Sequence, residues 1–234
     1  MDASPENAPA PRVSVLLVSW NNAEALRRLL AALEAASSRD GLEIIVVDNG
    51  SMDACPRMES EFPAIQMLRL PRHFGAVKAM NIAMRTASGD HLFLLEPGLE
   101  PAPEALPALS ACLEEKPDAV AVCPVVEDAT GEVVTRVRPL PSAAELLSLW
   151  QEGEFGGWRT ARLDQAQAVE YVRPPVCLIR SRFLKGLRYI DERYGHFGWD
   201  LEIAAQVARA AKRIYLLPGA RVRQSQPAAG AELA

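Results

Sequence analysis

A short apolar run that ends in a cluster of polar residues is the feature that most constrains this chain. The run lies in the segment EIIVVDNGSMD, which begins at Glu43, and Ile44 to Val47 form its uninterrupted β-branched part. Such a run is typical of a parallel strand covered on both faces, and ligands of open parallel sheets collect at the carboxyl ends of strands. A plain turn is the alternative, because Asp and Asn-Gly form turns in many settings. The residues expected at this binding edge are Asp48, Asn49, Ser51 and Asp53.

A second strand and a helix precede this segment. Val13 to Val18 is another continuous apolar run, and Ser19, Trp20 and Asn21 follow it. Asn21 is placed to cap a helix, with Glu24 three residues later, and a stripe of leucines then follows the spacing of a core-facing helix. The pattern predicts a strand–helix–strand unit with a right-handed crossover.

Further strands and helices are predicted along the rest of the chain. Strands are expected at 64–70, 91–95, 119–126, 132–137, 176–180 and 214–217, the fourth of them as a hairpin partner of the third. Helices are expected at 75–86, 103–116 and 199–211, with a short helix at 143–150. That short helix falls in a loop-rich stretch from 139 to 171, which would suit a flap over an acceptor.

Composition favours one globular domain that neither crosses a membrane nor binds nucleic acid. The 234 residues are 49% hydrophobic and 24% charged, and the net charge of -5 gives no basic surface for nucleic acid. No apolar run approaches the ~20 residues that cross a bilayer, and the polar, proline-rich start is unlike a signal peptide, so we expect a cytoplasmic protein. A single domain is expected at 12–225, between a disordered tail at 1–11 and a frayed tail at 226–234.

The four cysteines are expected to be reduced core thiols. They form no C-x-x-C pair and lie mostly in apolar runs, which favours buried thiols over disulfides or a zinc site.

Five segments in order carry a resemblance to a known family. The strand–helix–strand unit lacks the G-x-G-x-x-G turn of dinucleotide enzymes and the G-x-x-x-x-G-K of P-loop enzymes. Instead VSWNN, VVDNGSMD, RHFGAVKAMNIAM, SGDHLFLLEPG and the stretch from VCLIRS to PGARV resemble family-two glycosyltransferases, especially the rhamnosyltransferase-like branch. The resemblance covers Arg12 to Gln224. It implies an α/β chain of the GT-A fold, a Rossmann-like nucleotide-diphospho-sugar transferase fold whose mostly parallel central sheet has helices on both faces.

The same resemblance implies a donor site for a nucleoside diphosphate sugar. In the family the nucleoside lies across the first two strand ends, so Trp20 would pack on the base and Asp48 would accept a hydrogen bond from the base imide or the ribose. The alternative for Trp20 is a core aromatic at a strand end. Other residues placed around this pocket are Ser19, Asn21, Asn49, Ser51 and Asp53.

A glycine and two cations follow in the next matching segment. The family pattern N-x-G-x-x-x-x-x-N-x-G survives here as His73, Gly75 and Asn81. Gly75 would let the backbone approach the ligand, and Arg72 and Lys78 would face the diphosphate. Both cations are equally explained as solvated side chains.

Two departures from the family pattern concern a divalent metal. Where the family carries an acidic motif of the type N-P-D or D-x-D, this chain has Glu96-Pro97-Gly98, and Gln224 stands where a histidine is common. Manganese and magnesium prefer carboxylate, imidazole and water as ligands, so both changes remove expected ligands. Glu96 remains as a candidate ligand, with Glu100 nearby, or the site holds no metal and cations neutralise the diphosphate.

The base that the resemblance implies is Asp200, which opens a predicted helix in GHFGWDLEIA. An inverting transferase needs a carboxylate that reaches the acceptor hydroxyl opposite the leaving diphosphate. Glu202 lies two positions on, and His196 is the other candidate base. The alternative is structural, because acidic residues are favoured in the first turn of any helix.

Two functions from different classes follow. The first is an active inverting glycosyltransferase that moves a sugar from a UDP- or dTDP-sugar to a hydroxyl of a glycan or other acceptor, as in cell-wall or polysaccharide biosynthesis. The second is a GT-A domain that has lost transfer activity and serves as a nucleotide-binding or scaffold partner in glycan assembly. A nucleotidyltransferase is disfavoured, because its glycine- and lysine-rich N-terminal signature is absent.

Overall fold

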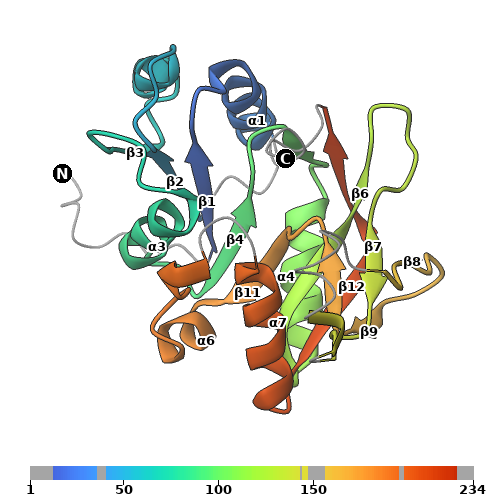
Figure 1. The fold of residues 1–234 in the computed structure, drawn as a ribbon. Helices are drawn as coiled ribbons and strands as arrows, with labels where there is room; N and C mark the ends of the chain where they lie inside the picture. Colours follow the sequence, from blue (N-terminus) through green and yellow to red (C-terminus); the bar gives the residue numbers. More distant parts are fainter. Residues whose placement is uncertain (1–12, 36–40, 143, 147–155, 195–197, 226–234) are drawn as a thin grey trace, which may run out of the picture.

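One large sheet organises the computed structural model, which describes residues 13–35, 41–142, 144–146, 156–194 and 198–225. In this part of the chain the sheet has nine strands in the order β3-β2-β1-β4-β11-β6-β12-β5, and β9 pairs with β12 (Figure 1). The strands are β1 (Val13–Ser19), β2 (Leu42–Asp48), β3 (Gln66–Arg69), β4 (His91–Leu95), β5 (Leu99–Pro101), β6 (Ala119–Glu127), β9 (Gln167–Val169), β11 (Cys177–Arg180) and β12 (Arg213–Gln224).

Most of these strands run in one direction. Strands β3, β2, β1 and β4 are parallel to one another, and β6 is parallel to β12. Because β11 is antiparallel to both β4 and β6, those two groups point the same way, and β11, β5 and β9 run against them. The expected α/β fold with a mostly parallel central sheet is confirmed.

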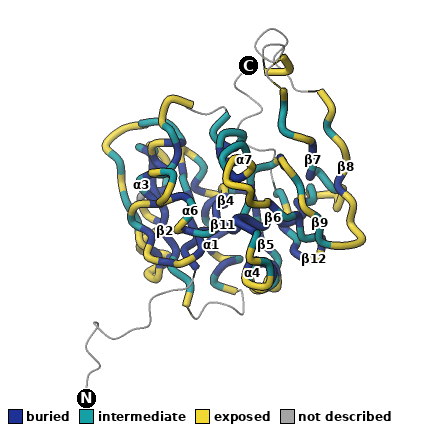
Figure 2. The backbone as a smooth tube through the Cα atoms, turned by 90° about the horizontal axis from the view of Figure 1, so that it is seen from below, coloured by how far each residue is buried: buried dark blue, intermediate teal, exposed yellow. Residues whose placement is uncertain are grey.

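Helices cover both faces of the sheet, and each covered face has its own apolar core. The helices are α1 (Ala23–Ala35), α2 (Met58–Glu61), α3 (Ala76–Thr86), α4 (Ala105–Glu115), α6 (Ser181–Gly186) and α7 (Trp199–Arg209), with 3₁₀ turns η2 (Cys55–Arg57) and η3 (Glu192–Tyr194). Helices α1 and α4 contribute to one core, whereas α3, α6 and α7 contribute to the other. Figure 2 shows buried strands running between the more exposed outer surfaces of the helices.

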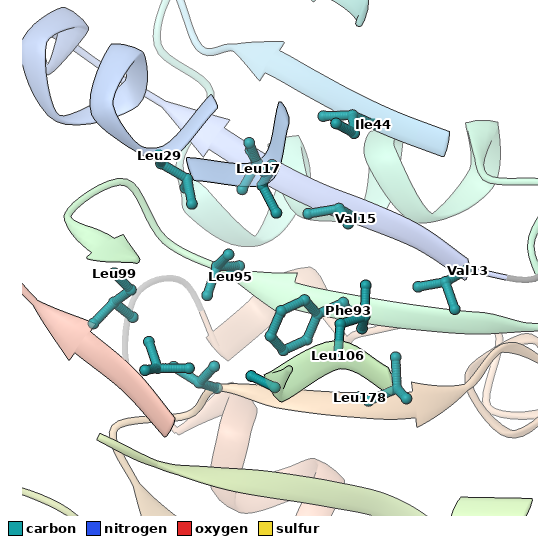
Figure 3. Packing of buried hydrophobic residues seen from close by; sticks show 14 of the residues in the cluster. Val13, Val15, Leu17, Leu29, Ile44, Phe93, Leu95, Leu99, Leu106 and Leu178 are labelled. Atoms are coloured by element: carbon teal, nitrogen blue, oxygen red, sulfur yellow. The ribbon is translucent and has the colours of Figure 1, made fainter. Parts of the chain in front are cut away.

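Successive side chains of a strand point to opposite faces of the sheet, and here both faces are covered. The strands therefore have apolar residues at consecutive positions. In β1, Val15 and Leu17 point into the first core and Leu16 into the second, and all three are buried. Figure 3 shows Leu17 and Leu29 on the same side of the sheet as Phe93. Truncating one such leucine to alanine typically costs about 2 to 5 kcal/mol of stability. The continuous run in β1 therefore reflects burial on two faces.

The predicted hairpin strand at 132–137 is confirmed only in its first residues, where the Val134 N–H donates to the Val126 carbonyl at 3.0 Å. After β6 the chain makes an isolated bridge between Glu127 and Val133, and β7 (Arg136–Arg138) then joins a separate sheet with β8 (Arg159–Thr160) and β10 (Tyr171–Arg173). The buried Thr135 hydroxyl accepts a 2.7 Å hydrogen bond from the Val126 N–H. A side chain thus takes the place of a ladder bond, and the chain leaves β6.

Other sequence predictions differ in extent. Strand β12 is longer than the predicted 214–217, and β5, β8, β9, β10 and α6 were not predicted. The tails at 1–11 and 226–234, His196 and most of the expected helix at 143–150 lie outside the described residues. All four cysteines are free thiols, and Cys55, Cys112 and Cys123 are buried. Across the described ranges, no helix is both long and apolar enough to span a bilayer.

Candidate active site

The loops after β1 and β2 are tied together at the carboxyl edge of the sheet. The strands are in register, so Ser19 lies opposite Asp48, and the Asn49 N–H donates to the Ser19 carbonyl at 2.8 Å. Buried Asp48 accepts a 3.0 Å hydrogen bond from the Ser51 N–H through Oδ1. The Ser51 hydroxyl accepts in turn from the Asn21 N–H at 3.0 Å. These polar residues therefore form one connected rim.

The cap of α1 comes from Asp53, so the predicted cap by Asn21 is wrong. Asp53 Oδ2 accepts from the Ala23 N–H and Oδ1 from the Cys55 N–H, each at 2.9 Å. Partial burial is the largest single influence and raises the pKa of Asp53, but the hydrogen bonds from Cys55 and Ala23 together lower it below its usual value. Asn21 instead adopts a left-handed φ of 51° and accepts from the Met52 N–H at 2.8 Å.

Trp20 stands at the rim and is not a core aromatic. Its side chain is 48% exposed, and its ring lies 4.4 Å from that of His73, at a tilt of 48°. The contact holds the indole beside the pocket, with accessible surface left for a stacked base. Ser19 is fully buried beneath the rim, where its hydroxyl contacts Asn22 and lies 3.0 Å from Cys55 Sγ.

The segment before α3 packs closely against the loop after β2. Gly50 has a φ of 78°, and a Cβ there would lie 2.7 Å from Arg72 Cα, so only glycine fits this approach. Asn49 Oδ1 accepts from the Phe74 N–H at 2.9 Å. Sequence reasoning gave Gly50 no role, although its place after Asn49 marked a turn.

Arg72 and Lys78 both lie against one aromatic ring, which is followed by Gly75. The exposed Arg72 and Lys78 each lie 4.9 Å from the centroid of Phe74, a cation–π distance. Gly75 precedes α3 with a φ of 90° and has open space where a Cβ would stand. The two cations are thus held on the Phe74 ring, in the segment that packs against Gly50.

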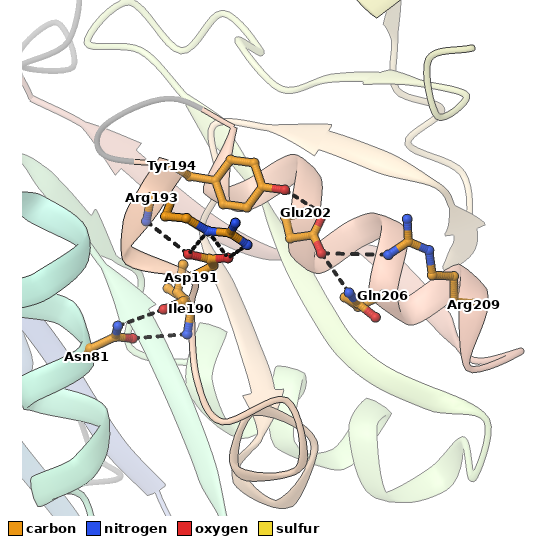
Figure 4. A network of polar contacts seen from close by, with 8 residues as sticks. All are labelled: Asn81, Ile190, Asp191, Arg193, Tyr194, Glu202, Gln206 and Arg209. Atoms are coloured by element: carbon orange, nitrogen blue, oxygen red, sulfur yellow. Dashed lines mark hydrogen bonds and ion pairs between the residues drawn. The ribbon is translucent and has the colours of Figure 1, made fainter. Parts of the chain in front are cut away.

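Asn81 joins two distant parts of the chain. Its side chain is buried, and it donates to the Ile190 carbonyl at 2.8 Å and accepts from the Ile190 N–H at 3.0 Å (Figure 4). This reciprocal pair occupies both ends of the amide. Asn81 therefore positions the segment that leads to α7.

The two positions that depart from the family's metal pattern are neighbours in space. Strand β12 pairs Gln224 with Leu99, and the Ser225 N–H donates to the Gly98 carbonyl at 2.9 Å. Glu100 lies 3.5 Å from the Arg28 guanidinium in an ion pair. Among the described residues no group of three His, Cys, Asp or Glu side chains is arranged to hold a metal ion. Gly98 and Gln224 supply neither a carboxylate nor an imidazole, so the described residues here do not fit a protein-ligated divalent metal.

Asp200 is held from one side by two donors. It lies in the first turn of α7, and Oδ2 accepts from the Tyr171 hydroxyl at 2.7 Å and from Arg173 Nε at 3.3 Å. Burial, followed by the charge of Asp200, raises the pKa of Tyr171 well above its usual value. Burial lowers the pKa of Arg173, but Asp200 and Tyr171 together outweigh this and raise it. Tyr171 therefore remains a neutral donor and Arg173 remains a cation.

Glu96 and Asp200 are near enough for their charges to interact, and we call the region of the sheet edge between them the recess. Its side chain is exposed, yet surrounding protein atoms displace enough water to raise its pKa, and the negative charge of Asp200 raises it further. A cavity of about 40 Å³ lies behind Asp200, lined by apolar atoms of residues such as Leu94 and Trp199.

Glu202 belongs to a network of side chains near the surface. It accepts from the Tyr194 hydroxyl at 3.2 Å and from Gln206 at 2.6 Å, and it lies 3.7 Å from Arg209 (Figure 4). Each of these contacts competes with a role as a free base.

Comparison with known proteins identifies the family. Residues 14–184 match the family model described as glycosyl transferase family 2. The chain belongs to glycosyl transferase family 2. The N-acetylglucosaminyl-diphospho-decaprenol L-rhamnosyltransferase of Mycobacterium tuberculosis is 23% identical over 228 residues, which cover 89% of this chain and 74% of that protein. The undecaprenyl-phosphate 4-deoxy-4-formamido-L-arabinose transferase of Klebsiella pneumoniae is 31% identical over 119 residues, 48% of this chain and 36% of that one.

Several solved structures share the fold of this family-two chain. GalNAc-T7 with UDP, GalNAc and Mn2+ superposes with a TM-score of 0.71 at 16% identity, covering 94% of this chain and 44% of that one. Residues 1–349 of S. aureus TarS give a TM-score of 0.67 at 17% identity, over 92% of this chain. The chain spans 60% of that TarS fragment. The GT-A fold is confirmed.

Proposed function

We propose that this family-two chain transfers a sugar from a UDP- or dTDP-sugar to an acceptor hydroxyl with inversion, and that Asp200 is the base. The proposal depends mainly on one observation, which is that the expected donor site and the expected base lie at the same edge of the sheet. The rim around Asp48 and the recess around Asp200 both lie at the carboxyl edge of the parallel strands, where ligands of such sheets bind.

The donor nucleoside would lie across the ends of β1 and β2. Trp20 offers exposed indole surface for stacking. Among the described residues the buried Asp48 carboxylate accepts through Oδ1, which leaves Oδ2 for a base imide or ribose hydroxyl. TarS has been solved with UDP and with UDP-GlcNAc, which supports a uridine nucleotide for a chain of this fold.

The acceptor hydroxyl would approach Asp200. Within the described residues, every side-chain hydrogen bond and ion pair of Asp200 reaches Oδ2, so Oδ1 is the oxygen left to take the proton as the hydroxyl attacks the anomeric carbon. Tyr171 and Arg173 fix the carboxylate in place, although the positive charge of Arg173 also weakens it as a base. The name of the mycobacterial relative gives a sugar on a diphospho-decaprenol, and we propose a lipid-linked saccharide as the acceptor class here too.

Metal ions contribute little to donor binding in this proposal. GalNAc-T7 and the mannosyltransferase PcManGT from Pyrobaculum calidifontis are described with Mn2+, but Gly98 and Gln224 offer no such ligands here. The charge of the diphosphate would be met by cationic side chains and backbone amides.

Calorimetric titration of the unmodified chain with UDP and dTDP tests the donor site. We expect binding that changes little between manganese and a chelator. A protein that binds neither nucleotide would contradict the proposal. A strong loss of affinity on chelation would show that Glu96 or Glu100 rebuilds a metal site.

The degenerate metal positions also favour a second candidate, a GT-A domain without transfer activity that binds nucleotide as a partner in glycan assembly. Nucleotide binding without consumption of any nucleotide sugar, alone or with acceptors, would support this alternative.

A further inference from the structure

A cation stands beside the proposed base. Arg173 ends β10, and its Nε lies 3.3 Å from Asp200 Oδ2 and 2.8 Å from the Tyr171 hydroxyl oxygen. In the part of the chain that the structure describes, every hydrogen bond and ion pair of the Arg173 side chain uses Nε. Its side chain is 44% exposed, whereas that of Asp200 is 8% exposed. The inner nitrogen of the guanidinium is therefore anchored, and the two outer nitrogens remain for a ligand.

Sheet register places this cation at the edge where the donor diphosphate is expected. Strand β11 pairs Cys177 with Leu94, one residue before β4 ends, so the segment between Arg173 and Cys177 continues along the edge that carries Glu96. Asp200, which Arg173 contacts, is also near enough for its charge to act on Glu96. Arg173, Asp200 and Glu96 thus border one recess.

Charge makes a cation necessary in this recess. A diphosphate is strongly anionic, and the recess already holds the carboxylates of Glu96 and Asp200. The described residues present no set of ligands for a metal ion that would offset this repulsion. A guanidinium is planar, always charged and able to donate to two phosphate oxygens at once.

We propose that Arg173 binds the diphosphate of the sugar donor through its outer guanidinium nitrogens and supplies the positive charge that a metal ion would otherwise bring. This inference rests on the proposed function, because it requires a nucleoside diphosphate at the sheet edge. The anchor on Asp200 and Tyr171 holds the guanidinium in one orientation, which reduces the entropy lost on binding. Arg173 also stabilises charge on the leaving diphosphate as the bond to the sugar breaks.

The test compares ligands that differ only in phosphate. Arg173→Gln, Arg173→Lys and the unmodified chain are titrated with uridine, UMP and UDP, and with the thymidine series, in manganese and in chelator. Arg213→Gln is the control, because Arg213 pairs with Asp118 at 3.3 Å, is 61% exposed and starts β12, outside the recess. We expect Arg173→Gln to weaken UDP binding by roughly tenfold to hundredfold, to leave uridine binding unchanged, and to be partly rescued by lysine.

Other outcomes separate the inference from the proposed function. Unchanged UDP affinity in Arg173→Gln overturns the inference, and so does an equal loss for uridine and UDP, since Arg173 would then act only through the fold. UDP binding by the unmodified chain that requires manganese also overturns it. If the unmodified chain binds uridine and UDP equally, the inference about Arg173 is overturned but the donor site of the proposed function stands. If the unmodified chain binds no nucleoside or nucleotide, the proposed function is overturned as well.

Discussion

The Tyr171 hydroxyl donates a 2.7 Å hydrogen bond to Asp200 Oδ2, and both side chains are buried. The bond links β10, in the small second sheet, to the first turn of α7. It holds Oδ2 of the carboxylate, so Oδ1 is the oxygen available to the proposed acceptor hydroxyl. The orientation of the proposed base therefore depends on a residue far from it in sequence.

Asp48→Ala should weaken binding of UDP or dTDP by roughly tenfold to a hundredfold. The substitution removes a buried acceptor, and an unpaired polar group on the bound base costs about 1 to 3 kcal/mol. Calorimetry measures the affinity. Glu59→Gln is a suitable control, because Glu59 is a 53% exposed partner of Arg69 and should leave nucleotide affinity unchanged. Equal affinity in Asp48→Ala and the unmodified chain would exclude Asp48 from the donor site.

Gly98→Asp should make nucleotide binding depend on manganese, at a cost in stability. A new carboxylate would stand near Glu96 and Gln224, but Gly98 has a φ of 99°, which costs a non-glycine residue about 1 to 3 kcal/mol. Gly98→Ala carries the same strain without the carboxylate, so denaturant unfolding and calorimetry of both variants separate the two effects. Manganese dependence in both variants, or in neither, would contradict this expectation.

Much of the large sheet was predictable, because its strands are buried on two faces. The runs in β1, β2 and β4 are apolar without interruption and leave little choice of structure. Strand β10 was missed because its three residues, Tyr171 to Arg173, are too few and too polar to show a pattern. Arg173 consequently had no assigned position, although it contacts the predicted base.

Among the rim residues, too, features set by neighbours in sequence were predicted correctly, whereas contacts between distant segments were not. Asp48 was placed correctly at a strand end, since that needed only the strand. The cap of α1 was assigned to Asn21, which is adjacent in sequence, whereas the structure uses Asp53 from the loop after β2. Contacts that a folded topology creates cannot be read from spacing along the chain.

Glu96→Gln should stabilise the fold at high pH and have little effect at low pH. The folded pKa of Glu96 is raised above the ordinary 4.5, so the folded state holds its proton more tightly than the unfolded state. Stability contributed by this group is present below the ordinary value and is lost as pH rises through the raised pKa. Urea unfolding from pH 4 to 9 measures the difference, and a difference independent of pH would show that charge is not its cause.

Asn81→Ala should destabilise the protein by about 1 to 3 kcal/mol, because the Ile190 N–H and carbonyl would lose their buried partner. We expect the denaturant midpoint of unfolding to fall. Without denaturant, where the variant is folded, its affinity for uridine should equal that of the unmodified chain. Loss of uridine affinity in a fully folded variant would show that Asn81 contributes to nucleoside binding.

The most direct test of the account is release of nucleoside diphosphate from a panel of UDP- and dTDP-sugars, alone and with lipid-linked saccharide acceptors. The account predicts release by the unmodified chain in manganese and in chelator. Asp200→Asn should then lower turnover by roughly 10²- to 10⁴-fold with nearly unchanged donor affinity, while Glu202→Gln retains turnover. Full turnover in Asp200→Asn, or no release from any sugar by an unmodified chain that binds the nucleotides, would contradict it.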